Sequence, residues 1–152
     1  MRCTWQVAFV ASAVLVGACG SNQKSESSSS GSSSSASARV YFVEPKDGAT
    51  VKSPVHLKFG IDNYQLAAVP QGTVESARPG TGHHHVGVDQ DCLASGTTIV
   101  KGTPSWVHFG DGKTEIDMQL PPGQHKLSLQ LGDDLHRAVD NLCQTITVNV
   151  VE

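Results

Sequence analysis

Residues 55–61 read VHLKFGI, in which every second side chain is apolar while His56 and Lys58 fall between. Successive side chains of a β-strand point to opposite faces, so this alternation predicts a strand with one buried face. The same period recurs in four other stripes: Val40 and Phe42; Ile116, Met118 and Leu120; Leu127, Leu129 and Leu131; and Ile146, Val148 and Val150. Helical periodicity is not evident, which predicts an all-β domain.

Turn residues separate these stripes, as Pro121-Pro122-Gly123 does before the stripe that begins at Leu127. About seven short strands at this spacing favour an immunoglobulin-like β-sandwich. A jelly roll or a small barrel would give a similar pattern. We assign this domain to residues 39–152.

The first 18 residues are typical of a secretory signal. Arg2 supplies positive charge, and the apolar run from Trp5 to Val16 is too short to span a bilayer comfortably. The run ends in residues 16–19, Val-Gly-Ala-Cys, which resemble a lipobox and predict lipidation of Cys19. An ordinary signal peptide or an N-terminal transmembrane anchor would also place the domain outside the cytoplasm.

Residues 19–38 comprise Cys19 and a Ser-rich segment without large apolar side chains, which predicts a disordered tether. The expected partner is therefore the membrane, reached through lipid, and the expected location is the periplasmic or outer surface of the cell envelope. Gly20 stands where a retention aspartate would stand, which favours the outer membrane in a Gram-negative cell.

Charge and size narrow the possible partners. The net charge is −3 and 16% of the residues are charged, so the chain lacks the basic surface that nucleic acid requires. After the signal and the tether, about 110 residues remain, which is enough for one hydrophobic core. The sequence identifies no protein partner.

The chain has four cysteines, of which Cys3 lies in the signal and Cys19 is the predicted lipid site. The remaining pair, Cys92 and Cys143, is predicted to form a disulfide in an oxidising compartment. The alternative is that both are thiolate ligands of a metal.

Six of the seven histidines lie between residues 83 and 136. Residues 82–89 read GHHHVGVD and predict a strand that places His83 and His85 on one face. Two neighbouring imidazoles favour copper, zinc or nickel over calcium or magnesium. His84 shares the opposite face with the valines and is interpreted as a hydrogen-bonded core or edge histidine.

Three further histidines, His108, His125 and His136, fall at strand ends or in loops and could complete a site for one copper or zinc ion. His125 has the parity of Leu127, so it could instead cap the core. A solvated loop side chain is the alternative for the other two. Asp133 is a candidate to orient a ligand imidazole.

Several motifs together resemble the DUF4399 family, a bacterial extracytoplasmic family of unassigned function. They are residues 42–51 (FVEPKDGATV), 82–85 (GHHH) with Asp89, 108–115 (HFGDGKTE), 120–127 (LPPGQHKL) and 132–136 (GDDLH). The resemblance implies that His83, His85, His108, His125 and His136 fall on recurrent family motifs. It implies no reaction.

A second likeness is to copper/zinc superoxide dismutase, in which a His-x-His strand precedes a cysteine bridged to the last strand. A zinc loop with a bridging histidine cannot be located here. Three functions therefore stay open: a metal-binding module, which is favoured, an immunoglobulin-like interaction domain with structural histidines, and a metal-dependent enzyme. A catalytic role is uncertain and disfavoured, and no catalytic residue is assigned.

Overall fold

The computed structural model describes residues 36–152, which form nine β-strands and contain no helix. The prediction of an all-β domain is confirmed. The predicted signal peptide, the lipidation of Cys19 and nearly all of the predicted tether lie outside the described residues. Within residues 36–152, no helix is long and apolar enough to cross a membrane.

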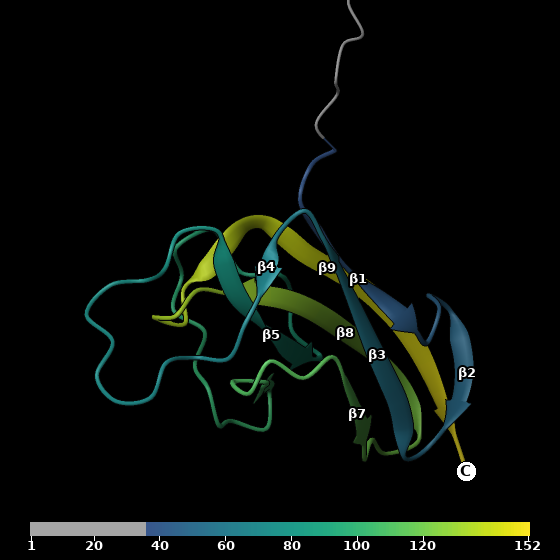
Figure 1. Ribbon diagram of the computed structural model, residues 1–152. Coiled ribbons are helices and arrows are strands. Elements are labelled where there is room, and N and C mark those ends of the chain that lie inside the picture. The colour runs from purple at the N-terminus through teal and green to yellow at the C-terminus, as the bar shows by residue number, and fades with distance from the viewer. Residues whose placement is uncertain (1–35) are drawn as a thin grey trace, which may run out of the picture. The chain divides into compact units, whose positions relative to one another are not determined.

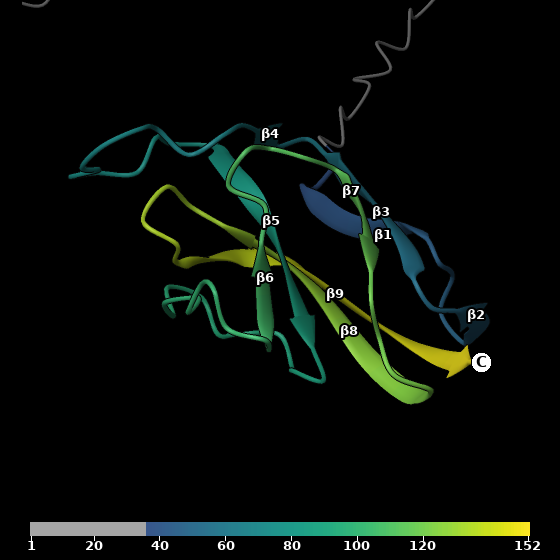
Figure 2. The same ribbon diagram turned by 90° about the horizontal axis from the view of Figure 1, so that it is seen from below.

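The strands form two sheets that face one another, as Figures 1 and 2 show. The smaller sheet has the order β1-β3-β7, built from β1 (Arg39–Glu44), β3 (Val55–Asp62) and β7 (Glu115–Met118). All three strands are antiparallel to their neighbours, and they correspond to apolar stripes identified in the sequence.

The larger sheet has the order β2-β9-β8-β5-β4, and β6 also pairs with β5. Its strands are β2 (Ala49–Lys52), β9 (Ala138–Val151), β8 (Gly123–Gly132), β5 (Thr81–Val88), β4 (Gln65–Leu66) and β6 (Trp106–His108). The strand order matches an immunoglobulin-like sandwich: β1, β3 and β7 correspond to its strands A, B and E in one sheet, and β5, β8 and β9 correspond to its strands C, F and G in the other. The number of strands, nine, exceeds the expected seven because a strand as short as β4 has too few residues to show an alternation of apolar and polar side chains.

The main core lies between the two sheets. Leu57 and Phe59 of β3 face Leu127 and Leu129 of β8, and all four side chains are buried. The ring of Phe59 also packs against Phe109 at 5.2 Å between centroids. The alternation that predicted these strands therefore arises because one face of each strand is packed in this core.

A second, smaller apolar cluster covers the other face of the larger sheet. It consists of Ile99, Trp106 and Ala138, with Leu93 packed against them. Residues 89–105 follow β5 and bring this cluster back over the sheet, where the Leu93 N–H donates to the Gln130 side chain. We call this side the outer face.

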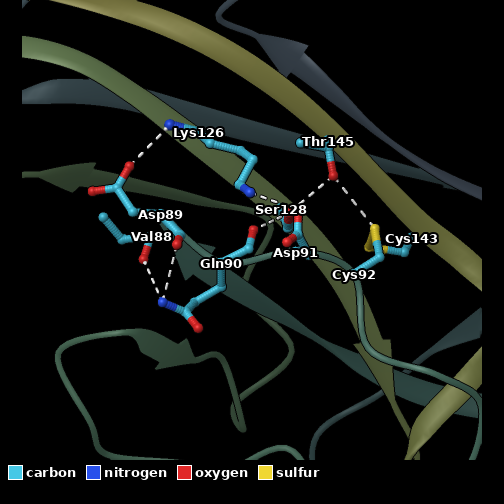
Figure 3. Close-up of polar contacts among 9 residues, drawn as sticks. All are labelled: Val88, Asp89, Gln90, Asp91, Cys92, Lys126, Ser128, Cys143 and Thr145. Atoms are coloured by element: carbon cyan, nitrogen blue, oxygen red, sulfur yellow. Dashed lines mark hydrogen bonds and ion pairs between the residues drawn. A yellow bond between two sulfur atoms is a disulfide. The ribbon is translucent and has the colours of Figure 1, made fainter.

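A disulfide holds this returning segment to the last strand. Cys92 and Cys143 are bonded, as Figure 3 shows, which confirms the predicted bridge and removes both sulfurs from metal ligation. Beside it, the Ser128 hydroxyl donates to the Gln90 carbonyl. The segment that covers the outer face is thus fixed by one covalent and several polar contacts.

Candidate metal centre

Strand β5 places three consecutive histidines in two environments. His84 points into the core, where its ring lies 5.4 Å from that of Phe59. His83, which lies opposite Gly132 of β8, and His85 point to the outer face. The predicted partition of His83 and His85 from His84 is confirmed.

Two more histidines reach the outer face from other parts of the chain. His108 ends β6 and lies directly opposite His85 in the antiparallel register. His136 lies between β8 and β9 with a left-handed backbone (φ 59°). Asp133 fixes this turn because its carboxylate accepts two backbone N–H groups of the turn. His83, His85, His108 and His136 converge, and we call them the histidine cluster.

The four rings are close enough to share one ion. Their centroids are separated by distances from 4.6 Å, between His83 and His85, to 5.7 Å, between His85 and His136. One ring nitrogen from each lies within 4.8 Å of the others. The Nε2 atoms of His108 and His136 are 3.0 Å apart, near the ~3.3 Å expected between neighbouring nitrogens on a tetrahedral zinc.

The two inner rings lack the contacts that buried polar groups normally have. His83 and His85 are fully buried, and neither ring nitrogen of either residue has a hydrogen-bond partner in the described part of the chain. A buried polar atom without a partner costs about 1–3 kcal/mol. Nitrogens of this kind, which lie within 4.8 Å of those of His108 and His136, are suited to a bound cation.

The cluster is uncharged at neutral pH. Burial, followed by the charges of the neighbouring histidines, lowers the pKa of His83 to about 3 and that of His85 to about 2. Burial also lowers the pKa of His108 and His136. Neutral imidazole is the form that binds transition metals, so the rings are ready to bind without first losing a proton.

The predicted role of Asp133 needs correction. Its carboxylate binds the Arg137 guanidinium and the backbone of the turn, so it positions the loop that carries His136 rather than a ligand ring. The buried neighbour of the cluster is Asp134, which binds Arg78 through both carboxylate oxygens. The Arg78 hydrogen bonds lower the pKa of Asp134 to about 2.

His125 lies apart from the cluster, contrary to the prediction that included it among the ligands. Its Nδ1 is 3.0 Å from the Asp89 carboxylate and its Nε2 is 3.0 Å from the Pro121 carbonyl. Both nitrogens are therefore occupied, and the side chain covers the end of the core, as its parity with Leu127 allows. His84 is a core residue as expected, but its nitrogens have no hydrogen-bond partner within residues 36–152.

Two glycines make room for the cluster, and the sequence analysis missed both. A Cβ on Gly132 would lie 2.5 Å from Cε1 of His85 and 2.9 Å from its Nδ1. A Cβ on Gly110 would lie 2.7 Å from Nε2 of His108. Neither glycine has a positive φ, so the adjacent ring, and not the backbone conformation, is what a side chain would disturb.

Substitution of Gly132 by alanine should therefore impair any metal site in the cluster. We expect Gly132→Ala to displace the His85 ring and weaken metal binding by about 10–100-fold, as loss of supporting contacts does in other sites. Gly87→Ala is the matched control, because its Cβ would meet Trp106 on the same face and no cluster residue. Isothermal titration with zinc compares the variants, and equal weakening in both would assign the effect to general strain.

Comparisons with known proteins give a family but no activity. The sequence profile of a family described as "Domain of unknown function (DUF4399)" matches residues 57–151, which include the whole cluster. No curated protein matches. Among solved structures, one similar chain is the endo-β-1,4-mannanase from Thermotoga petrophila, with 16% identity and a TM-score of 0.47 over 79% of this chain and 21% of that chain. The present chain thus spans about a fifth of that enzyme's length.

Proposed function

This chain belongs to the DUF4399 family, and we propose that its domain binds one copper or zinc ion through the histidine cluster. The observation that carries the proposal is the pair of fully buried inner rings, His83 and His85, whose nitrogens lack partners within residues 36–152. Coordination would give one nitrogen of each ring a partner. The metal-free protein would otherwise bear the cost of burying them unpaired.

The donor set supports the choice of metals. Four imidazoles suit Zn(II) in a tetrahedral site or Cu(II) in a tetragonal one. Within residues 36–152, both cysteines are joined in the disulfide and Met118 lies in the main core, so the cluster is not given the soft sulfur ligands that favour Cu(I). The hard cations calcium and magnesium prefer oxygen ligands.

Metal titration of the full chain, purified in mild detergent and stripped of metal, tests the proposal. Wild type should bind one equivalent of Cu(II) or Zn(II), and His83→Ala/His85→Ala should lose this stoichiometric binding. His56→Ala is the matched control, because His56 lies on β3 and pairs with Asp117 outside the cluster. Absence of binding by wild type would leave the alternative of an interaction domain with structural histidines.

We further propose that lipid on Cys19 holds the domain at the cell envelope, on the basis of the signal-like residues 1–18 and the lipobox-like residues 16–19. Two or three acyl chains would anchor the protein durably, whereas one binds only marginally. An anchored metal module of this kind would buffer, sense or deliver metal at the membrane surface.

Cys19→Ser should therefore move the protein from the membrane fraction to the soluble extracytoplasmic fraction or leave it unprocessed. Labelling of cells with a palmitate analogue should mark wild type and not the variant. Cys3→Ser is the control, since it removes a cysteine without touching the lipobox or the Cys92–Cys143 disulfide. Equal labelling of wild type and Cys19→Ser would contradict the lipid anchor.

A further inference from the structure

The histidine cluster is closed on one side and open on the other. His83 and His85 are fully buried beneath it, whereas His108 and His136 are only half-buried. A cavity of about 700 Å³ has His108 in its wall, and another of about 330 Å³ has His136 in its wall. Lys101 lines both cavities. The two openings therefore meet at this lysine, on the exposed side of the cluster.

The groups around the cluster would not neutralise the positive charge of a bound metal ion. All four ligands are neutral, so a divalent ion would retain its full positive charge. The carboxylates that influence the cluster are already paired: Asp111 with Lys113, Asp133 with Arg137, and Asp134 with Arg78. The loaded site would therefore have a strong excess of positive charge in a partly dehydrated setting.

Lys101 adds to this excess at the opening. Within the described residues it makes no ion pair, unlike the three cations named above. It lines the cavity whose wall contains His108 and also the cavity whose wall contains His136. Lys101 thus lies beside both rings at the exposed edge of the cluster.

We propose that a metal held by the histidine cluster accepts a small anion as an additional ligand at this opening, and that Lys101 attracts the anion. The inference rests on the metal site proposed above and adds the class of its exogenous ligand. Copper(II) and zinc can both take a fifth ligand. The anion would neutralise part of the metal charge and lie between the metal and the ammonium group.

Azide titration of the copper-loaded full chain tests the inference. Azide should produce a new azide-to-copper absorption band and change the electron paramagnetic resonance spectrum. Lys101→Gln should weaken azide binding about 3–10-fold at low ionic strength, because one nearby positive charge is removed. Lys101→Arg should restore it, and Lys58→Gln, on the smaller sheet, should leave it unchanged.

Copper affinity measured in the same variants separates this effect from damage to the site. Lys101→Gln should bind copper as tightly as wild type or more tightly, since a like charge is lost, while it binds azide less well. Copper binding without any azide response, or equal azide affinity in wild type and Lys101→Gln, would overturn the anion site and leave the metal site standing. Failure to bind copper at all would overturn both.

Discussion

The metal-free protein should lose about 6 kcal/mol of folding stability between pH 7 and about pH 5, with about 2 kcal/mol from each of three buried imidazoles. Burial lowers the pKa of His83, His84 and His85 to about 3, 4 and 2. In the unfolded chain each would titrate near its ordinary value of 6.5. A loss of this size is comparable to the whole stability of a small domain.

Proton binding determines the direction in which folding stability changes with pH. Between the ordinary pKa and the lowered one, the unfolded chain binds protons that the folded chain excludes, so acid favours unfolding. The contribution of these three histidines to stability is therefore complete above their pKa in the unfolded chain, and it declines as the pH falls below that pKa. The Asp134 carboxylate contributes a separate loss only at lower pH, because its pKa is lowered from 3.8 to about 2.

Urea unfolding in EDTA at several pH values measures this loss. His84→Leu should reduce the pH dependence by about one third and should stabilise the protein by about 1–3 kcal/mol at neutral pH, since it removes an unpaired polar group from the core. The variant should still bind metal, because His84 faces away from the cluster. A saturating metal, at 100 times its Kd, should restore about 2.7 kcal/mol. Stability that stays constant from neutral to weakly acidic pH would contradict the neutral, buried state of these rings.

Strand parity predicted half of the cluster and could not predict the rest. The alternation along residues 82–89 was sufficient to place His83 and His85 on one face, because side-chain direction in a strand depends only on position. His108 lies opposite His85 because of the register in which β6 pairs with β5, and alternation within one strand does not determine such a pairing. Parity therefore offered His125 an alternative place at the core, but it could not show that only His108 and His136 complete the cluster.

The errors at His125 and Asp133 have a common physical cause. Each side chain is bound by a partner that sequence spacing does not reveal. Asp89, just after the end of β5, pairs with His125, and Asp133 accepts a backbone N–H of its own turn. The sequence also did not reveal that Gly132 leaves room for the His85 ring, because a glycine at a strand end is equally typical of a turn. By contrast, the fold class and the disulfide depended on alternation and on the number of available cysteines, which the sequence contains directly.

Removal of the disulfide should cost about 4 kcal/mol, the value that chain entropy gives for a loop of about 50 residues. Cys92 and Cys143 are 51 residues apart, and the loop that they close contains β6, β7, β8 and the turn of His136. Cys92→Ala/Cys143→Ala should therefore lower the urea midpoint strongly, and dithiothreitol should lower that of wild type to a similar value. Dithiothreitol should have no further effect on the variant, which is the internal control.

The same variant separates the stability of the fold from the geometry of the cluster. The four cluster histidines are positioned by β5, β6 and the turn before β9, and Gln130 of β8 lies between His85 and Cys143 in the sheet because it pairs with both. The folded variant should bind one metal ion, and its apparent affinity should fall only in proportion to the unfolded fraction. Metal should then raise the urea midpoint of the variant as it does that of wild type. Loss of metal binding under conditions in which circular dichroism shows the variant folded would mean that the bridge positions the ligands themselves.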